Sequence, residues 1–325
     1  MLRHTVRPGN ATGGQDVVPR MSAYVEQNEI ADPFILQVID RPEPHAGPGE
    51  VRIRARAAGL NPVDWKIAAH PQVATAFGIS APTGFGNDVA GVVDEVGPGV
   101  ATFAVGDRIF ASARGHAVAE HVVLDANAAG IHRTPDGLAD EIAGALPIAA
   151  RTADAALATA RIGEGDTVLI GGAAGGVGVL AVQLAVRAGA TVIATASPAN
   201  HDFLRELGAT PTEYGDGLAD RVRALAPDGL DAAVDLHGVE AIEAAAALGV
   251  PGDRLATIAA ANPPHGAVAT GGQDARPGAV DAIAALLASG ELTLPIAARF
   301  PIGRIDDAVA LQRGGHVRGK IVITL

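Results

Sequence analysis

The sequence predicts a two-domain α/β protein, in which an antiparallel, barrel-like unit precedes a doubly wound parallel sheet. Two features of the chain support this fold class. Short runs of alternating polar and apolar residues, broken by Pro and Gly, fill residues 21–146. From residue 165 the pattern changes to apolar strands that alternate with amphipathic helices. At 325 residues the chain is long enough to form two hydrophobic cores.

In the first unit, the segment GEVRIRARAAGLNP predicts a strand that buries one face. Val51, Ile53 and Ala55 alternate with three arginines, which is the period-two pattern of a half-buried strand. The row of arginines is expected to face water. The runs DVAGVVDEVGPGV, VGDRIFA and AEHVVL predict further short strands. Together these segments favour an antiparallel, barrel-like domain.

In the second unit, four apolar runs predict parallel strands at residues 167–170, 191–196, 231–236 and 254–260. Between the first two runs, apolar residues recur at helical spacing on one face and end near Gly189. The stretch VEAIEAAAAL predicts another helix between the third and fourth runs. Strands and helices therefore alternate as they do in a doubly wound sheet.

The domain boundaries follow from these patterns. Strand-like alternation begins only after Met21, so we interpret residues 1–20 as a disordered leader or arm. The barrel-like domain then covers residues 21–146, and the doubly wound domain covers residues 147–290. The last segment, residues 291–325, has two strand-like runs around one helix, and we expect it to return to the first domain.

A glycine-rich turn lies between the first apolar run and the helix that follows it. In the pattern G-x-G-x-x-G, Ala173 substitutes for the first glycine, while Gly175 and Gly178 occupy the other two places. Gly175 lets the backbone approach a pyrophosphate, and Gly178 lets the helix pack closely on the strand. The alternative is a tight turn without a ligand. We predict dinucleotide binding by Ala173, Ala174, Gly175, Gly176 and Val177.

The end of the second apolar run, ATASPAN, favours NADPH as the cofactor. It has no Asp or Glu for a ribose 2'-hydroxyl, so a 2'-phosphate is not repelled. Ser197 is the candidate donor to that phosphate, although Ser197 followed by Pro198 also predicts a helix N-terminus without a ligand. No Arg or Lys follows immediately. His201 and a distant base are therefore candidate helpers.

Composition limits the partners and the compartment. A net charge of -12 leaves no broad basic face for nucleic acid or an anionic membrane, so we expect a small-molecule partner. The chain has no Cys, which excludes disulfides and thiolate zinc sites and favours the cytoplasm. Gln183 and Arg187 interrupt the longest apolar run, so no transmembrane segment is predicted.

With these residues in view, the chain resembles the medium-chain dehydrogenase/reductase superfamily, in its zinc-free quinone oxidoreductase branch. From about Ala23 to Leu325, the motifs AGLNPVDWK, GNDVAGVVDEVGPGV, VGDRIF, GAAGGVG, FLRELGA and RGKIVI follow the family order and spacing. The resemblance implies a GroES-like catalytic domain, a Rossmann domain and an NADPH cleft between them. Zinc relatives carry Gly-His-Glu where this chain has Gly86-Asn87-Asp88, so no metal is expected.

The resemblance also implies catalytic residues in the segment after Asn61. Lys66 matches a position where the family often has Tyr or Lys, and we assign it to the enolate that develops during reduction; a solvated surface lysine is the alternative. Asn61 is expected to contact cofactor or substrate, unless it simply opens a loop. Asp64 is expected to pair with a neighbour and fix the loop. Trp65 is either a wall of the substrate pocket or a core residue.

Four further cofactor contacts follow from the family positions. Thr152 matches a threonine near the nicotinamide carboxamide, although its Ala-Arg-Thr context departs from the family pattern. Tyr214 matches a tyrosine near the adenosine phosphate, and Lys320 matches a lysine that often reaches the cofactor. His237 ends a central strand where the family usually has a small apolar residue, and it is predicted to contact a ribose or to donate a proton.

These assignments predict an oxidoreductase that transfers a hydride from NADPH to a quinone or to the C=C bond of an α,β-unsaturated carbonyl. The Ala-, Gly- and Arg-rich composition suggests bacterial secondary metabolism. The alternative is a non-redox protein on the same fold, either a cyclase or a regulatory NADPH-binding partner, which the altered AART and DLHG segments motivate. By analogy, we expect a homodimer that forms through edge strands of the Rossmann sheets.

Overall fold

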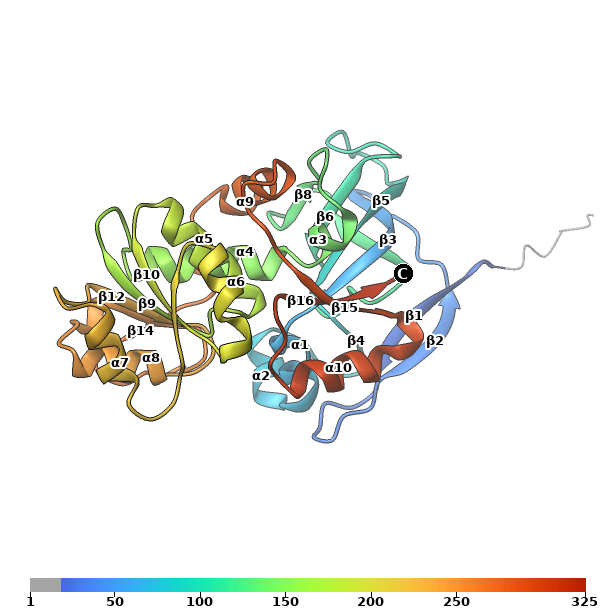
Figure 1. Ribbon diagram of the computed structural model, residues 1–325. Coiled ribbons are helices and arrows are strands. Elements are labelled where there is room, and N and C mark those ends of the chain that lie inside the picture. The colour runs from blue at the N-terminus through green and yellow to red at the C-terminus, as the bar shows by residue number, and fades with distance from the viewer. Residues whose placement is uncertain (1–18) are drawn as a thin grey trace, which may run out of the picture.

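The computed structural model describes residues 19–325 and shows two lobes side by side (Figure 1). One lobe holds a parallel sheet and the other holds the antiparallel strands. The predicted leader over residues 1–20 falls almost entirely outside the described residues. At its end, the Arg20 carbonyl accepts a hydrogen bond from the backbone N–H of Glu43 at 2.9 Å, which joins Arg20 to the antiparallel lobe.

The antiparallel lobe is built on a 7-stranded sheet and a 3-stranded sheet. The larger sheet has the order β15-β16-β3-β5-β6-β8, with β7 beside β3. Its strands are β3 (Glu50–Leu60), β5 (Asp88–Val96), β6 (Arg108–Ser112), β7 (His121–Asp125), β8 (Ile131–Arg133), β15 (Ile296–Pro301) and β16 (Lys320–Thr324). The smaller sheet has β1 (Met21–Gln27) between β2 (Gln37–Pro42) and β4 (Thr83–Gly84). The last strand of the chain therefore pairs with β3, far from it in sequence.

One detail of β3 differs from the prediction. Arg54 and Arg56 are exposed, but Arg52 is only 8% exposed. Its guanidinium donates two hydrogen bonds to the carboxylate of Asp94, both at 3.0 Å, and lies 2.9 Å from a carboxylate oxygen of Glu95. The expectation of a fully solvated arginine row was wrong for Arg52, because acidic residues on the neighbouring strand β5 cover that side chain.

The second lobe confirms the doubly wound parallel sheet. Its strand order is β11-β10-β9-β12-β13-β14, and the neighbours are parallel. The strands are β9 (Thr167–Gly171), β10 (Thr191–Thr195), β11 (Thr210–Thr212), β12 (Ala232–Asp235), β13 (Leu255–Thr257) and β14 (Val268–Ala269). Strands β11 and β14 escape prediction because they are too short to show an apolar run.

Ten α-helices cover the sheets of the described chain. They are α1 (Pro62–Ala69), α2 (Pro71–Ala76), α3 (Asp140–Gly144), α4 (Pro147–Thr159), α5 (Gly176–Arg187), α6 (His201–Glu206), α7 (Leu218–Leu225), α8 (Glu240–Ala247), α9 (Ala279–Ala288) and α10 (Ile305–Arg313). Short 3-10 turns occur at η1 (Pro198–Asn200), η2 (Gly252–Arg254), η3 (Gly272–Asp274) and η4 (Ile302–Arg304). Among the helices of residues 19–325, none combines the length and apolar content needed to cross a bilayer.

The two lobes share a hydrophobic core. One cluster of buried side chains includes Phe110 of β6, Leu146, Ile170 of β9 and Leu180 of α5, all with 0% exposure. Helix α4 lies in the middle of this cluster and packs against α5. Because a close-packed core resists small displacements, α4 fixes the position of the parallel sheet relative to the antiparallel sheet.

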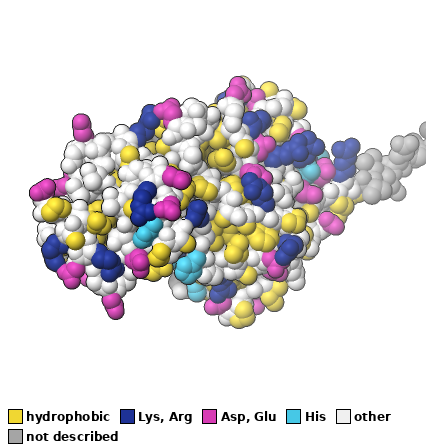
Figure 2. All heavy atoms as spheres, in the orientation of Figure 1, with side chains coloured by type: hydrophobic (Ala, Val, Ile, Leu, Met, Phe, Trp, Pro, Cys, Tyr) yellow, Lys and Arg dark blue, Asp and Glu magenta, His cyan; other side chains and the backbone are white. Residues whose placement is uncertain are grey.

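On the surface drawn in Figure 2, Lys and Arg side chains are interspersed with Asp and Glu.

Candidate functional site

The glycine-rich turn joins β9 to α5, and its glycines serve different purposes. At Gly178, a Cβ would lie 2.3 Å from the backbone oxygen of Gly172, so the close approach of helix and turn requires glycine there. At Gly175, a Cβ would meet only that same oxygen, at 3.4 Å. Packing within the protein therefore leaves room for a side chain at Gly175. An open glycine at the N-terminus of a 12-residue helix fits a phosphate group that approaches the backbone.

The C-terminal segment lies over this turn. The backbone N–H of Gly319 donates to the carbonyl of Ala174 at 3.0 Å, and Gly175 and Gly319 form a parallel β-bridge. A Cβ at Gly176 would lie 2.5 Å from Cδ of Lys320, so the stem of that lysine occupies the space beside Gly176. The predicted cofactor residues Gly175, Gly176 and Lys320 are thus brought together from the middle and the end of the chain.

Lys320 leads into a buried polar group that we call the Lys320 cluster: Asn61, Asp64, Asn87, Asp88 and Lys320. Lys320 Nζ donates to Asn61 Oδ1 at 2.5 Å, and Asn61 Nδ2 donates to Asp88 Oδ2 at 2.9 Å. The backbone N–H of Asn61 donates to Asp64 Oδ2 at 2.7 Å, and Asn87 Nδ2 donates to Asp64 Oδ1. Because both polar groups of the Asn61 side chain are engaged within the protein, its placement favours a positioning role over contact with a ligand.

Burial changes the proton affinity of this cluster. It raises the pKa of Asp64 to about 7, although hydrogen bonds from Asn87 and Asn61 act in the opposite direction. Burial likewise raises the pKa of Asp88 to about 6, against the attraction of the Lys320 ammonium. Burial lowers the pKa of Lys320, which the two carboxylates oppose. A low-dielectric interior disfavours every charged form. The attraction between the Lys320 ammonium and the two carboxylates, and the hydrogen bonds from Asn61 and Asn87, offset part of this cost.

The side chains of the cluster do not fit a zinc ion. Zinc in proteins is held by thiolate, imidazole and carboxylate groups, whereas this cluster offers two amides and an ammonium beside its carboxylates. In the described part of the chain, no three His, Cys, Asp or Glu side chains are gathered as metal ligands would be. The carboxylates of Asp64 and Asp88 are already bonded to Asn87 and Asn61.

Helix α4 connects the cluster to the parallel lobe. The backbone N–H of Ile148 donates to both carboxylate oxygens of Asp88 at 3.2 Å, and the charge of Arg151 lowers the pKa of Asp88. Thr152 is buried one helical turn beyond Ile148 and therefore lies on the same side of α4. Sequence reasoning singled out Thr152 but missed the contribution of Ile148.

Three of the predicted cofactor residues, Ser197, Tyr214 and His237, follow the carboxyl ends of β10, β11 and β12. Ser197 follows β10, and its neighbour Ala196 donates from its backbone N–H to the Thr212 carbonyl at 3.0 Å. Tyr214 lies two residues after Thr212 in the chain, and its side chain is 49% exposed. His237 is exposed beyond β12, and its Cβ would lie 3.0 Å from a Cβ at Gly172 of the turn.

Lys66 and Trp65 lie on α1, whose N-cap residue is Asn61. Lys66 is exposed, and within residues 19–325 no carboxylate forms an ion pair with its ammonium. Trp65 packs against the barrel core, and the Arg313 guanidinium of α10 lies 5.2 Å from its ring centroid. The placement of Trp65 therefore resembles that of a core residue at the α1–α10 contact more than that of a free pocket wall.

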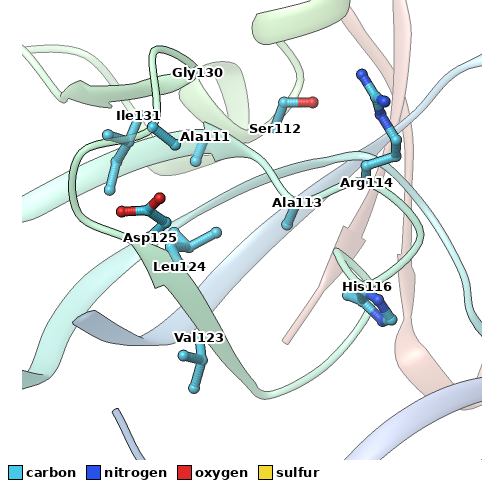
Figure 3. A pocket seen from close by; sticks show the side chains of 11 residues that line it. Ala111, Ser112, Ala113, Arg114, His116, Val123, Leu124, Asp125, Gly130 and Ile131 are labelled. Atoms are coloured by element: carbon cyan, nitrogen blue, oxygen red, sulfur yellow. The ribbon is translucent and has the colours of Figure 1, made fainter. Parts of the chain in front are cut away.

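A separate cavity of about 200 Å³ lies in the barrel lobe, lined by side chains that include Arg114, His116 and Asp125 (Figure 3). Its lining contains no residue of the glycine-rich turn or of the Lys320 cluster. Ligand pockets are usually about 300–1,000 Å³, so this cavity is too small for a dinucleotide. His116 Nδ1 lies 3.2 Å from the hydroxyl of Tyr24, which ties the rim to β1.

Two family models match the chain. Residues 47–145 match the model described as the alcohol dehydrogenase GroES-like domain, and residues 176–275 match the model described as zinc-binding dehydrogenase. The first match falls in the antiparallel lobe, and the second falls in the parallel lobe.

The chain is similar to parts of longer proteins. Erythronolide synthase EryA2 of Saccharopolyspora erythraea is 46% identical over 167 residues, which are 49% of this chain and 4% of that protein. The chloroplastic quinone-oxidoreductase homolog of Spinacia oleracea is 36% identical over 220 residues, which are 64% of this chain and 60% of that protein. The matches thus span less than two thirds of the length of either relative.

Solved structures match nearly the whole chain. CurK enoyl reductase superimposes with a TM-score of 0.78 and 28% identity, covering 93% of this chain and 99% of that chain. Mycobacterial Rv1454c complexed with NADPH superimposes with a TM-score of 0.79 and 26% identity, covering 94% of this chain and 100% of that chain.

Proposed function

The chain belongs to the medium-chain dehydrogenase/reductase superfamily, in its quinone oxidoreductase-like branch, and on this premise we propose that it transfers a hydride from NADPH to a conjugated acceptor. The acceptor is a quinone or the C=C bond of an α,β-unsaturated carbonyl. Similarity to CurK enoyl reductase, to a quinone-oxidoreductase homolog and to erythronolide synthase EryA2 supports both acceptor classes and a place in secondary metabolism.

The observation that carries this proposal is the contact of Lys320 with both halves of the site. Its stem lies beside Gly176 of the glycine-rich turn, and its ammonium bonds to Asn61 at the start of α1. A dinucleotide bound at the turn would therefore extend from the parallel lobe toward the segment that contains Asn61, Trp65 and Lys66. NADPH supplies the hydride when it is bound. The protein has to orient the acceptor and stabilise the oxygen that gains negative charge.

Lys66 is the residue proposed to stabilise that oxygen. It is an exposed cation on the helix that Asn61 opens, and an ammonium group interacts favourably with an enolate oxygen. The preference for NADPH rests on the absence of a carboxylate at Ala196 and Ser197 and on the solved NADPH complex of a structural relative.

The proposal is tested by following the oxidation of NADPH and NADH by absorbance against a panel of quinones and enones. Lys66→Ala is measured beside the parent protein, with Arg54→Ala as a control for removing an exposed cation from the same lobe. We expect turnover with NADPH that falls roughly 100-fold in Lys66→Ala, with little change in NADPH affinity. A normal rate in Lys66→Ala would remove this residue from the mechanism.

If the parent protein binds NADPH but oxidises it with no acceptor in the panel, the reductase assignment fails. A non-redox role on the same fold, as a cyclase or a regulatory NADPH-binding protein, would then replace it.

A further inference from the structure

The loop after β10 has no cation of its own to receive a phosphate. Residues 196–204, with the sequence ASPANHDFL, contain neither Arg nor Lys. The next cation along the chain, Arg205, forms an ion pair with Asp202 at 2.5 Å. A 2'-phosphate beside Ser197 would therefore need a positive charge from another part of the chain.

Arg318 lies at this loop, although it is more than a hundred residues away in sequence. Its Nε donates to Asn200 Oδ1 at 2.7 Å, and its Nη2 donates to the carbonyl of Ala199 at 2.9 Å. Asn200 Nδ2 in turn donates to Ser197 Oγ at 3.2 Å. Arg318 is thus joined through one amide to the serine predicted to meet the phosphate.

The backbone next to Arg318 is fixed on the glycine-rich turn. Gly319 bonds to Ala174 and bridges to Gly175. It has a φ of +76°, and a Cβ there would lie 2.1 Å from the carbonyl oxygen of Pro295, so glycine is required. The Arg318 side chain therefore starts beside the turn expected to hold the pyrophosphate and extends to the loop expected to meet the adenosine ribose.

The guanidinium of Arg318 has N–H donors that its two bonds to Asn200 and Ala199 do not use. Arginine has five N–H donors, and the two bonds to Asn200 and Ala199 leave the remainder free for a phosphate. The guanidinium lies 4.9 Å from the ring centroid of Phe203, a cation–π arrangement that restricts its orientation. Arg318 is exposed, and its planar fork suits phosphate oxygens.

We infer that Arg318 is the residue that selects NADPH over NADH, by pairing with the 2'-phosphate of the adenosine ribose beside Ser197. This inference rests on the proposed function, because it assumes that the glycine-rich turn binds a dinucleotide. It assigns the missing cation to the C-terminal segment. Residues 318–320 then serve three parts of the site, with Arg318 at the ribose, Gly319 at the turn and Lys320 at the cluster that holds Asn61.

The test measures equilibrium binding of NADPH and NADH, without any acceptor, to the parent and to Arg318→Gln. Arg313→Gln is the matched control, because Arg313 is another exposed arginine of the C-terminal segment but stacks on Trp65. We expect Arg318→Gln to lose roughly 10- to 100-fold in NADPH affinity, as for a charge-assisted hydrogen bond, with NADH affinity unchanged. The salt dependence of NADPH binding should fall in the same variant.

Each other result overturns the inference in a recognisable way. A parallel loss of NADPH and NADH affinity in Arg318→Gln would mean that Arg318 only supports the loop. An unchanged preference for NADPH over NADH in Arg318→Gln would mean that another group binds the 2'-phosphate. Equal affinity of the parent for both nucleotides would also refute it, while leaving an NADH-dependent reductase possible. The binding experiment contains no acceptor, so its outcome does not depend on hydride transfer. A protein that prefers NADPH through Arg318 but reduces no acceptor would refute the proposed function and leave this inference standing. A parent protein that binds neither nucleotide would refute the proposed function and this inference together.

Discussion

Strands β3 and β5 carry a charged cluster at each end, and the two clusters differ in their exposure to water. At one end, Arg52 lies among Glu43, Asp94 and Glu95, whose side chains are 17%, 27% and 30% exposed. The hydrogen bonds that Arg52 donates to the Asp94 carboxylate raise the pKa of Arg52. At the other end, where Gly59 of β3 pairs with Asp88 of β5, the Lys320 cluster is excluded from water and burial opposes its charges.

The difference shows what a buried ionic group contributes. The Arg52 cluster connects β3 to β5 and to the segment that holds Glu43, and water can solvate its carboxylates. The Lys320 cluster gains less from its charges, because burial costs each of them hydration energy. What it provides is position: through Lys320 and Asp88 it joins the glycine-rich turn and α4 to the start of α1.

The largest expected effect on stability comes from Lys320→Met. The variant removes the cation whose charge attracts the buried carboxylates of Asp64 and Asp88 and leaves Asn61 Oδ1 without its donor. Leaving buried charge uncompensated costs about 3–5 kcal/mol. Urea unfolding should show this loss in the free energy of unfolding. The double variant Lys320→Met/Asp88→Asn should recover part of it, because one uncompensated charge is removed. A loss below about 1 kcal/mol in Lys320→Met would mean that water reaches the cluster.

Arg52→Met should destabilise the protein less. It removes the bidentate bond to Asp94, but the freed carboxylates can take up water, so we expect a loss of about 1–3 kcal/mol. The same urea experiment at low and high salt distinguishes the two ends of the strand pair. High salt should reduce the difference in free energy of unfolding between the parent and Arg52→Met. The corresponding difference between the parent and Lys320→Met should stay largely unchanged. Equal salt sensitivity would contradict the comparison.

The pH dependence of the free energy of unfolding should identify Asp64 as a group that takes up a proton when the chain folds. Its pKa is about 7 in the folded chain and lies near 3.8 ordinarily, so between these values the folded protein binds more protons than the unfolded one. Stability attributable to Asp64 therefore falls as pH rises through this window, by at most about 1.4 kcal/mol per pH unit. Asp64→Asn should make the unfolding free energy less dependent on pH between pH 5 and pH 7.5. An unaltered slope would assign the proton uptake to another group.

Local sequence patterns were sufficient to predict the fold. The apolar periodicity of α5 and the runs at β9, β10, β12 and β13 depend on neighbours a few residues apart. The structure places these elements within two residues of the prediction, except that β13 ends at Thr257, three residues before the predicted end. The glycine-rich turn was also predictable from the sequence, because the strand before it and the helix after it are its neighbours in the chain.

The partners within the site were not predictable in the same way. Lys320 and Asn61 are 259 residues apart in the chain, and Arg318 and Asn200 are 118 apart. Such contacts exist only after β16 pairs with β3. The burial of Arg52 was missed for a similar reason, since a period-two pattern reports which face a residue occupies but not which acidic side chains cover it.

The smallest expected effect on stability is that of Gly175→Ala, which examines how the turn beside the Lys320 cluster is shaped. Gly175 has a φ of -76°, and its added methyl group meets only Gly172 O at an ordinary 3.4 Å, so the cost should stay below about 1 kcal/mol. Gly178→Ala, the matched control, places a methyl group 2.3 Å from the same backbone oxygen and should cost about 1–3 kcal/mol. If a pyrophosphate approaches the turn, Gly175→Ala should nevertheless weaken NADPH binding roughly tenfold or more. Full NADPH affinity in a stable Gly175→Ala variant would mean that the turn does not receive the phosphates, because a ligand in contact with that backbone has no space for the methyl group.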